Sequence, residues 1–146
     1  MTRLLPIQLP IPQQKYLKQN KPKSMITITP LDKIGNDDRG YTYEYFHERM
    51  GRHLVCFRKA GSVSGRHYHK GISLTKNPEL LILAQGNVTV NWRHIHNKEL
   101  QHLWVEGPAR IEIPPYIWHE VVAMTDCTFL ELNSLSEHEA DTFTDS

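Results

Sequence analysis

From residue 25 onward, the sequence alternates short runs of β-branched, aromatic and aliphatic residues with turn-forming residues. Glycine, asparagine, aspartate and proline punctuate these runs, as in Gly35-Asn36-Asp37-Asp38 and Gly107-Pro108. The runs predicted to form strands are 25–29, 41–46, 54–58, 80–85, 88–92, 100–105, 109–113, 119–124 and 127–132. Many short strands at regular spacing are typical of a β-sandwich or β-barrel. The sequence therefore predicts an all-β fold.

A chain of 146 residues is expected to form one domain with a sizeable core. Residues 1–24 are rich in proline, glutamine and lysine, and we expect an extended basic arm there. We assign residues 25–134 to the β-barrel and residues 135–146 to an acidic C-terminal tail. The one helical candidate lies around residues 136–140, with Ser136 as its expected N-cap.

The charges nearly cancel, with 17 Lys and Arg against 16 Asp and Glu, so the composition favours neither nucleic-acid nor membrane binding. The basic arm and the acidic tail either meet across a dimer or are two solvated ends, and solvated ends are the simpler expectation. The sequence shows neither a signal-peptide core nor a span-length apolar run. We expect a cytoplasmic protein in which Cys56 and Cys127 stay reduced.

His67 and His69 are separated by one residue, and both would point to the same face of a strand. Glu79 follows, and His119 lies much later in the chain. Three imidazoles and one carboxylate would hold a divalent transition metal and leave positions open for a substrate or water.

These residues stand in a frame that resembles the two motifs of the cupin family. The frame consists of Gly61, His67, His69, Glu79 and Gly86, followed by Pro114 and His119. The resemblance covers roughly residues 40–133 and implies a jelly-roll barrel of the double-stranded β-helix type. It also implies that His67, His69, Glu79 and His119 are metal ligands, with iron, manganese, zinc or nickel as the ion.

The chain departs from the cupin pattern at two informative places. Residues 70–78 lengthen the gap between His69 and Glu79, so we interpret them as an inserted loop. Tyr116 replaces the glycine of the second motif, which predicts that the turn before His119 does not need a strongly positive φ.

Other candidate residues receive structural interpretations. His94 and His96 also have one residue between them, but without a glycine frame we expect a surface or loop pair. Trp118 should point away from the site if its strand is regular. Ordinary structural or surface roles are expected for the remaining candidates, His47, His53, His102, His138, Arg58, Arg66 and Lys76.

The resemblance leaves several functions open. A metal-dependent dioxygenase or isomerase/epimerase acting on a small molecule leads, with a metal-containing sensor as one alternative. Tracts 113–119 and 131–134 also resemble cupins of sugar-nucleotide and capsular-polysaccharide biosynthesis. That similarity adds a second alternative, a metal-free isomerase or epimerase with His67 and His69 as acid and base. By family analogy we expect a homodimer.

Overall fold

The computed structural model describes residues 25–145, and the predicted N-terminal arm lies outside the described residues. Within residues 25–145, the regular structure is β-strand throughout, apart from one short helix after the last strand. The elements are β1 (Thr27–Pro30), β2 (Asp32–Asp37), β3 (Gly40–Glu44), β4 (Leu54–Arg58), β5 (Val63–His67), β6 (Glu79–Gln85), β7 (Asn87–His94), β8 (Gln101–Glu106), β9 (Ala109–Ile113), β10 (Ile117–Ala123), β11 (Cys127–Glu131) and α2 (Leu135–Ala140).

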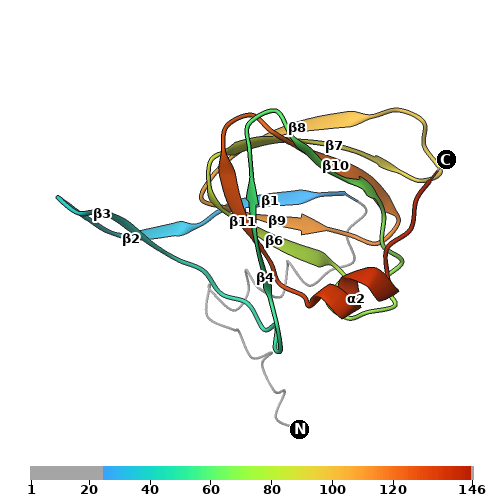
Figure 1. Cartoon of the computed structure of the whole chain (residues 1–146), viewed down its shortest axis with the longest axis horizontal. Coiled ribbons are helices and arrows are strands. Elements are labelled where there is room, and N and C mark those ends of the chain that lie inside the picture. The colour runs from blue at the N-terminus through green and yellow to red at the C-terminus, as the bar shows by residue number, and fades with distance from the viewer. Residues whose placement is uncertain (1–24, 146) are drawn as a thin grey trace, which may run out of the picture.

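Two antiparallel sheets form the barrel, as Figure 1 shows. One sheet has the strand order β1-β9-β6-β11-β4, and the other has the order β5-β10-β7-β8. Strands that are distant in the sequence therefore lie side by side in each sheet, which is the arrangement expected of a jelly roll. The predicted all-β fold is confirmed, and β5 is an additional strand that completes the second sheet.

The strands bury one face because their side chains alternate. In β10, the residues Ile117, His119, Val121 and Ala123 are all buried, and the residues between them are partly exposed. Together with the inward residues of β6, β7, β9 and β11, the apolar members form the main core between the sheets. His119 belongs to this inward row, so the fold itself directs its imidazole into the barrel.

A hairpin of β2 and β3 projects from the barrel (Figure 1). Its turn lies at residues 38–39, later than the predicted turn at residues 35–38. The difference arises because Gly35, Asn36 and Asp37 continue the strand. A register shift between Lys33 and Gly35 allows this extension.

Helix α2 begins one position earlier than predicted. Ser134, rather than Ser136, is the N-cap, and it forms a capping box with Glu137. The helix packs near the end of the barrel from which β6 starts, as the label in Figure 1 shows. Within the described residues, no helix has the length and apolarity needed to cross a membrane.

Candidate functional site

Adjacent strands bring two of the predicted ligands together. His67 ends β5 and pairs directly with His119 of β10. Gly65 permits the close approach of these strands, because a Cβ there would lie 2.9 Å from the backbone oxygen of His119. The ring centroid of His67 is 4.8 Å from that of His69 and 5.0 Å from that of His119. The three histidines therefore surround one point inside the barrel.

Glu79 reaches the same point from the opposite sheet, as the first residue of β6. Its Oε1 atom is 3.6 Å from Nε2 of His119, and its Oε2 atom is in close contact with Nε2 of His69. The side chains of Glu79, His69 and His119 are at most 4% exposed. The structure thus places all four predicted ligands in one buried cluster, although they come from distant parts of the sequence.

Backbone carbonyls orient two of the imidazoles. Nδ1 of His69 lies 2.6 Å from the carbonyl oxygen of Asp141, and Nδ1 of His119 lies 3.0 Å from that of Ile117. A carbonyl only accepts, so in each neutral ring Nδ1 carries the proton and Nε2 presents a lone pair. Both lone pairs face the carboxylate of Glu79. Nitrogen lone pairs that face carboxylate oxygens need a proton or a cation between them. This set of ligand atoms therefore fits a metal ion.

The unmatched state of His69 supports the same interpretation. Its Nε2 atom is buried, and its close contact within residues 25–145 is with an acceptor, the Oε2 atom of Glu79. Buried polar atoms in folded proteins nearly always have a partner, and an orphan calls for an explanation such as a bound ion. Potential ligand atoms of His67, His69 and His119 all lie within 4.8 Å of one another.

Lys76 is fully buried beside this cluster, so its predicted role as a surface cation is wrong. Its Nζ atom donates to Oε2 of Glu79 at 2.5 Å and to Oδ1 of Asn133 at 3.0 Å, and it lies 3.0 Å from Nδ1 of His138. The three contacts can use all three ammonium protons, which offsets the cost of burying the charge. The inserted loop therefore places the ammonium group of Lys76 beside the carboxylate of Glu79.

His138 also lies beside the cluster, although it was predicted to be an isolated structural histidine. Its ring centroid is 5.3 Å from that of His67 and 5.6 Å from that of His69. His138, His69 and Glu79 form a second group with ligand atoms within 4.8 Å of one another. The Ser134-x-x-Glu137 capping box was the available sequence signal, because it places His138 on a helix.

The C-terminal segment holds the inserted loop in place. The carboxylate of Asp141 accepts hydrogen bonds from the backbone N–H groups of Lys70, at 2.7 Å, and Ser73, at 3.0 Å. Glu137 accepts a hydrogen bond from the Thr75 hydroxyl at 3.0 Å. Asp141 is fully buried, so this part of the acidic tail is not a solvated end. Residues 70–78 and α2 therefore form one polar unit against the site.

Charges and burial set the protonation of the cluster. Burial alone would raise the pKa of Glu79, but attraction to His69 and Lys76 holds that pKa well below its usual range. Burial lowers the pKa of His67 to about 3, and repulsion from His119 contributes. Burial, followed by repulsion from Lys76, lowers the pKa of His138 to about 4. At neutral pH the site thus contains an anionic Glu79 carboxylate and the neutral imidazoles of His67 and His138, the forms in which these groups bind metals.

The turn before His119 differs from the prediction. Tyr116 has a φ of 63°, so the turn does need a positive φ even though a non-glycine residue occupies it. The N–H of Tyr116 donates to the carbonyl oxygen of His69 at 2.7 Å. This bond joins the segment before His119 to the segment after His67, which explains why the conformation is kept.

The other predicted structural residues lie away from the cluster. Trp118 faces outward, where the guanidinium of Arg93 is 5.4 Å from its ring centroid. His94 and His96 have ring centroids 5.1 Å apart at the end of β7, and neither belongs to a potential metal-binding group in the described part of the chain. Cys56 and Cys127 are both free, as predicted.

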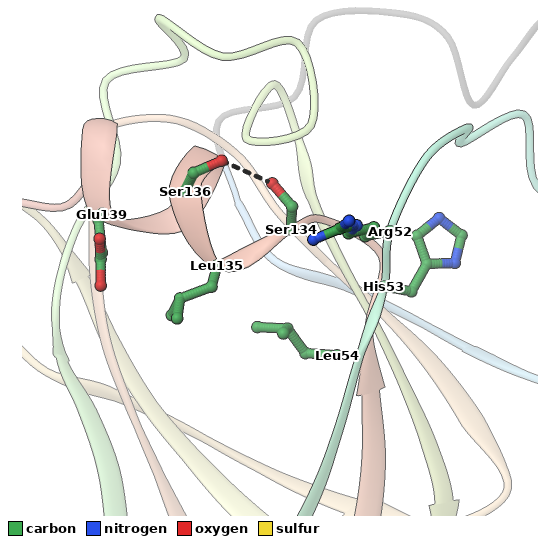
Figure 2. A pocket seen from close by; sticks show the side chains of 7 residues that line it. All are labelled: Arg52, His53, Leu54, Ser134, Leu135, Ser136 and Glu139. Carbon is green, nitrogen blue, oxygen red and sulfur yellow. Dashed lines mark hydrogen bonds between the residues drawn. The ribbon is translucent and has the colours of Figure 1, made fainter.

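A pocket of about 420 Å³ lies between the start of β4 and α2 (Figure 2). Its lining includes Arg52, Leu54 and Leu135 but none of the cluster residues. In Figure 2 the side chains of Leu54 and Leu135 face each other across it, and Arg52 points toward Ser134. Leu54, which lines this pocket, is directly opposite Glu131 of β11 in the sheet.

The chain matches the family model described as the polysaccharide biosynthesis C-terminal domain over residues 35–143. No curated protein matches it. Among solved structures, a mutant of the 3,4-ketoisomerase QdtA from Thermoanaerobacterium thermosaccharolyticum, in complex with TDP-4-keto-6-deoxyglucose, is 18% identical with a TM-score of 0.60. The match covers 81% of this chain and 86% of that chain.

Two further structures show the same fold. The WlaRB TDP-quinovose 3,4-ketoisomerase from Campylobacter jejuni is 18% identical with a TM-score of 0.60, covering 85% of this chain and 95% of that chain. The dTDP-6-deoxy-D-glucose-3,5-epimerase RmlC from Legionella pneumophila Philadelphia 1, in complex with dTDP-4-keto-L-rhamnose, is 16% identical with a TM-score of 0.60. That match covers 84% of this chain and 74% of that chain. At these identities the similarity establishes the fold, and it confirms the cupin-type barrel.

Proposed function

The chain belongs to the polysaccharide biosynthesis C-terminal domain family, and from this premise we propose that it is an isomerase or epimerase of a nucleotide-linked keto sugar. The names of the three similar structures support the reaction class, because they describe two sugar 3,4-ketoisomerases and one 3,5-epimerase. The observation that carries the proposal is the buried cluster of histidines with Glu79 and Lys76 inside the barrel. The dioxygenase reaction finds no support in these names, and we do not propose it.

Both reaction types move a proton at a carbon next to a carbonyl group. Such a reaction needs a base for the proton, a positive group near the oxygen that becomes an enolate, and exclusion of water. The cluster offers the buried ammonium of Lys76 and side chains that are almost inaccessible to solvent, and the neutral imidazole of His67 lies beside them. Its composition therefore suits proton transfer on a keto sugar.

We further propose that His67, His69, Glu79 and His119 hold one divalent transition metal ion. The proposal is supported by the two Nε2 lone pairs that face the carboxylate of Glu79 and by the burial of the Nε2 atom of His69. When bound, the ion would supply Lewis-acid polarisation of the keto oxygen. Which metal is bound depends on the metals available in the cell as much as on the ligand types.

The metal-free alternative assigns acid–base roles to His67 and His69. Burial lowers the pKa of His67 to about 3, so its imidazole is neutral and free to accept a proton, but a pKa this low makes it a weak base. His69 is held by the carbonyl of Asp141. A chelator separates the two arrangements, because only the metal-dependent one loses activity when the ion is removed.

The test is exchange of sugar protons with solvent. We expect the wild-type protein, incubated with TDP-4-keto-6-deoxyglucose in D₂O, to incorporate deuterium next to the keto group and to form an isomer or epimer, both followed by NMR. His67→Asn should abolish this activity, and His94→Asn should retain it, because His94 lies outside the cluster. A wild-type protein that neither binds nor exchanges this sugar, with or without added metals, would refute the proposed function.

A further inference from the structure

We propose that Glu131 is the carboxylate that takes up and returns the proton of the sugar. The inference rests on the proposed function and adds a residue outside the predicted ligand set. Two features carry it: the position of Glu131 on the inner face, beside the cluster, and its buried oxygen without a hydrogen bond.

Glu131 points into the barrel. It alternates with Phe129 and Cys127 in β11, and both of these side chains belong to the main core between the sheets. Glu79 lies on the inner face for the same reason, since Leu81 and Leu83 of β6 are core residues. The two carboxylates therefore project from neighbouring strands into one interior.

One carboxylate oxygen of Glu131 is left without a partner. The side chain is 16% exposed, and its Oε2 atom is buried and forms no hydrogen bond within residues 25–145. The carboxylate has a hydrogen bond with the Asn133 side chain, and its two other contacts are long. Oε1 is 3.9 Å from Sγ of Cys56, and Oε2 is 3.9 Å from Nδ1 of His138. A carboxylate kept for structure alone would be expected to have its oxygens satisfied, so this free acceptor points to a ligand.

Glu131 lies next to the cluster across the sheet, with its Oε2 atom 3.9 Å from Nδ1 of His138. Glu131 is directly opposite Leu81, so Glu79 is its diagonal neighbour across the sheet. Diagonal neighbours are separated by about 7–8 Å between their Cα atoms. On its other edge, β11 pairs with β4, where Leu54 is directly opposite Glu131. Leu54 also lines the pocket of Figure 2.

The environment of Glu131 also suits a group that accepts a proton. Burial raises the pKa of Glu131, and the negative charge of Glu79 raises it further. A base with a raised pKa is closer to the working pH and therefore more effective. Glu79 differs, because Lys76 and the histidines stabilise its charged form. The two carboxylates thus have separate tasks.

The proposed step balances without a co-reactant. The Glu131 carboxylate takes the proton from the carbon next to the keto group. The electron pair of the broken C–H bond forms a carbon–carbon double bond, and the carbonyl π pair moves to oxygen. In the isomerase reaction, the Glu131 carboxylic acid exchanges its proton with solvent and then delivers a proton, a deuteron in D₂O, to the former carbonyl carbon. The hydroxyl proton passes between the two oxygens, which exchanges the keto and hydroxyl positions.

The test compares Glu131→Gln with Glu120→Gln as a matched control. The Glu120 side chain is 17% exposed, close to the value for Glu131, but it lies on the outside, bonded to Arg66 and Asn91. With TDP-4-keto-6-deoxyglucose in D₂O, we expect Glu131→Gln to slow deuterium incorporation by about 100-fold or more. Its affinity for the sugar nucleotide and its melting temperature should stay near the wild-type values. Glu120→Gln should exchange like the wild type.

Three outcomes would overturn the inference, and they can be told apart. If the wild type exchanges and Glu131→Gln exchanges equally fast, the inference is wrong and the proposed function stands. If Glu131→Gln loses binding together with exchange, Glu131 holds the ligand and does not carry its proton. If the wild type neither binds nor exchanges, both proposals fail. Should the glutamine variant not fold, Glu131→Asp replaces it, and unchanged exchange in that variant contradicts the inference.

Discussion

The backbone carbonyl of Asp141 lies 2.6 Å from Nδ1 of His69, a residue 72 positions earlier in the chain. This contact fixes the ring of a predicted ligand from the C-terminal segment. The carboxylate of the same aspartate holds the N–H groups of Lys70 and Ser73. One residue therefore orients the imidazole and anchors the loop that carries Lys76 toward the site.

Asp141→Ala should destabilise the protein by about 2 kcal/mol, because two partly buried backbone donors lose a buried, charged acceptor. The measurement is urea denaturation at neutral pH. The control is Asp145→Ala, whose ion pair with Arg93 is partly exposed, at 19% for Arg93 and 29% for Asp145. A partly exposed pair of this kind should contribute about 0–1 kcal/mol. Equal losses in the two variants would contradict the role assigned to Asp141.

Lys76→Met should lower the free energy of unfolding by about 3 kcal/mol, because it leaves the buried carboxylate of Glu79 without its cation. The double variant Lys76→Met with Glu79→Gln removes both charges and should recover part of this loss. Denaturation of the four proteins gives the coupling between the two residues. Additive losses would show that the pair is not coupled.

The cluster should carry about one equivalent of a single transition metal in protein purified without a histidine tag. Elemental analysis by mass spectrometry checks this, and a chelator should lower the melting temperature as the ion is lost. His69→Ala should remove the ion, whereas His94→Ala should keep it, since the pair of His94 and His96 belongs to no potential metal-binding group among the described residues. Absence of metal from the wild type after reconstitution would refute the ligand assignment and leave the acid–base alternative.

Metal-free protein should lose stability as the pH falls from about 6.5 toward 4. Burial lowers the pKa of His67 to about 3 and that of His138 to about 4. In this window the unfolded chain binds protons that the folded chain does not, so acid favours unfolding. Each such histidine contributes a slope of up to about 1.4 kcal/mol per pH unit. Denaturation between pH 7 and 4 measures the slope, and His138→Gln should reduce it. An unchanged slope in that variant would contradict burial of a neutral His138.

Local patterns in the sequence predicted most of the strands, and the resemblance to the cupin motifs predicted the four candidate ligands. Alternation along β10 directs His119 inward, and the single residue between His67 and His69 gives them the same face. At Gly86, one of the glycines of the cupin-like motif, a larger residue would clash with the backbone. A Cβ on Gly86, which has a φ of +99°, would lie 2.4 Å from the backbone oxygen of Asp126. Such features depend on neighbouring residues and strand geometry, so they can be read along the chain.

The remaining parts of the site depend on contacts between distant segments. Lys76 is indistinguishable from a surface lysine in the sequence, because its burial requires Glu79, Asn133 and His138 to meet its ammonium group. His138 joins the site only because α2 docks on the inserted loop. The conformation of Tyr116 was missed for a similar reason, since its hydrogen bond to the carbonyl of His69 stabilises a positive φ.

By itself, the sequence determined the all-β fold, the inward face of the strands and the residue types available for metal binding, because periodicity, turn chemistry and ligand spacing are local properties. Only the tertiary structure decided that Glu79 forms an ion pair with a buried lysine. It also decided that the Glu131 side chain points into the barrel with one oxygen that forms no hydrogen bond among the described residues. The physical reason is that burial and protonation depend on every group surrounding a side chain. Those surroundings come from strands and loops that are far apart in the sequence and meet only in the folded barrel.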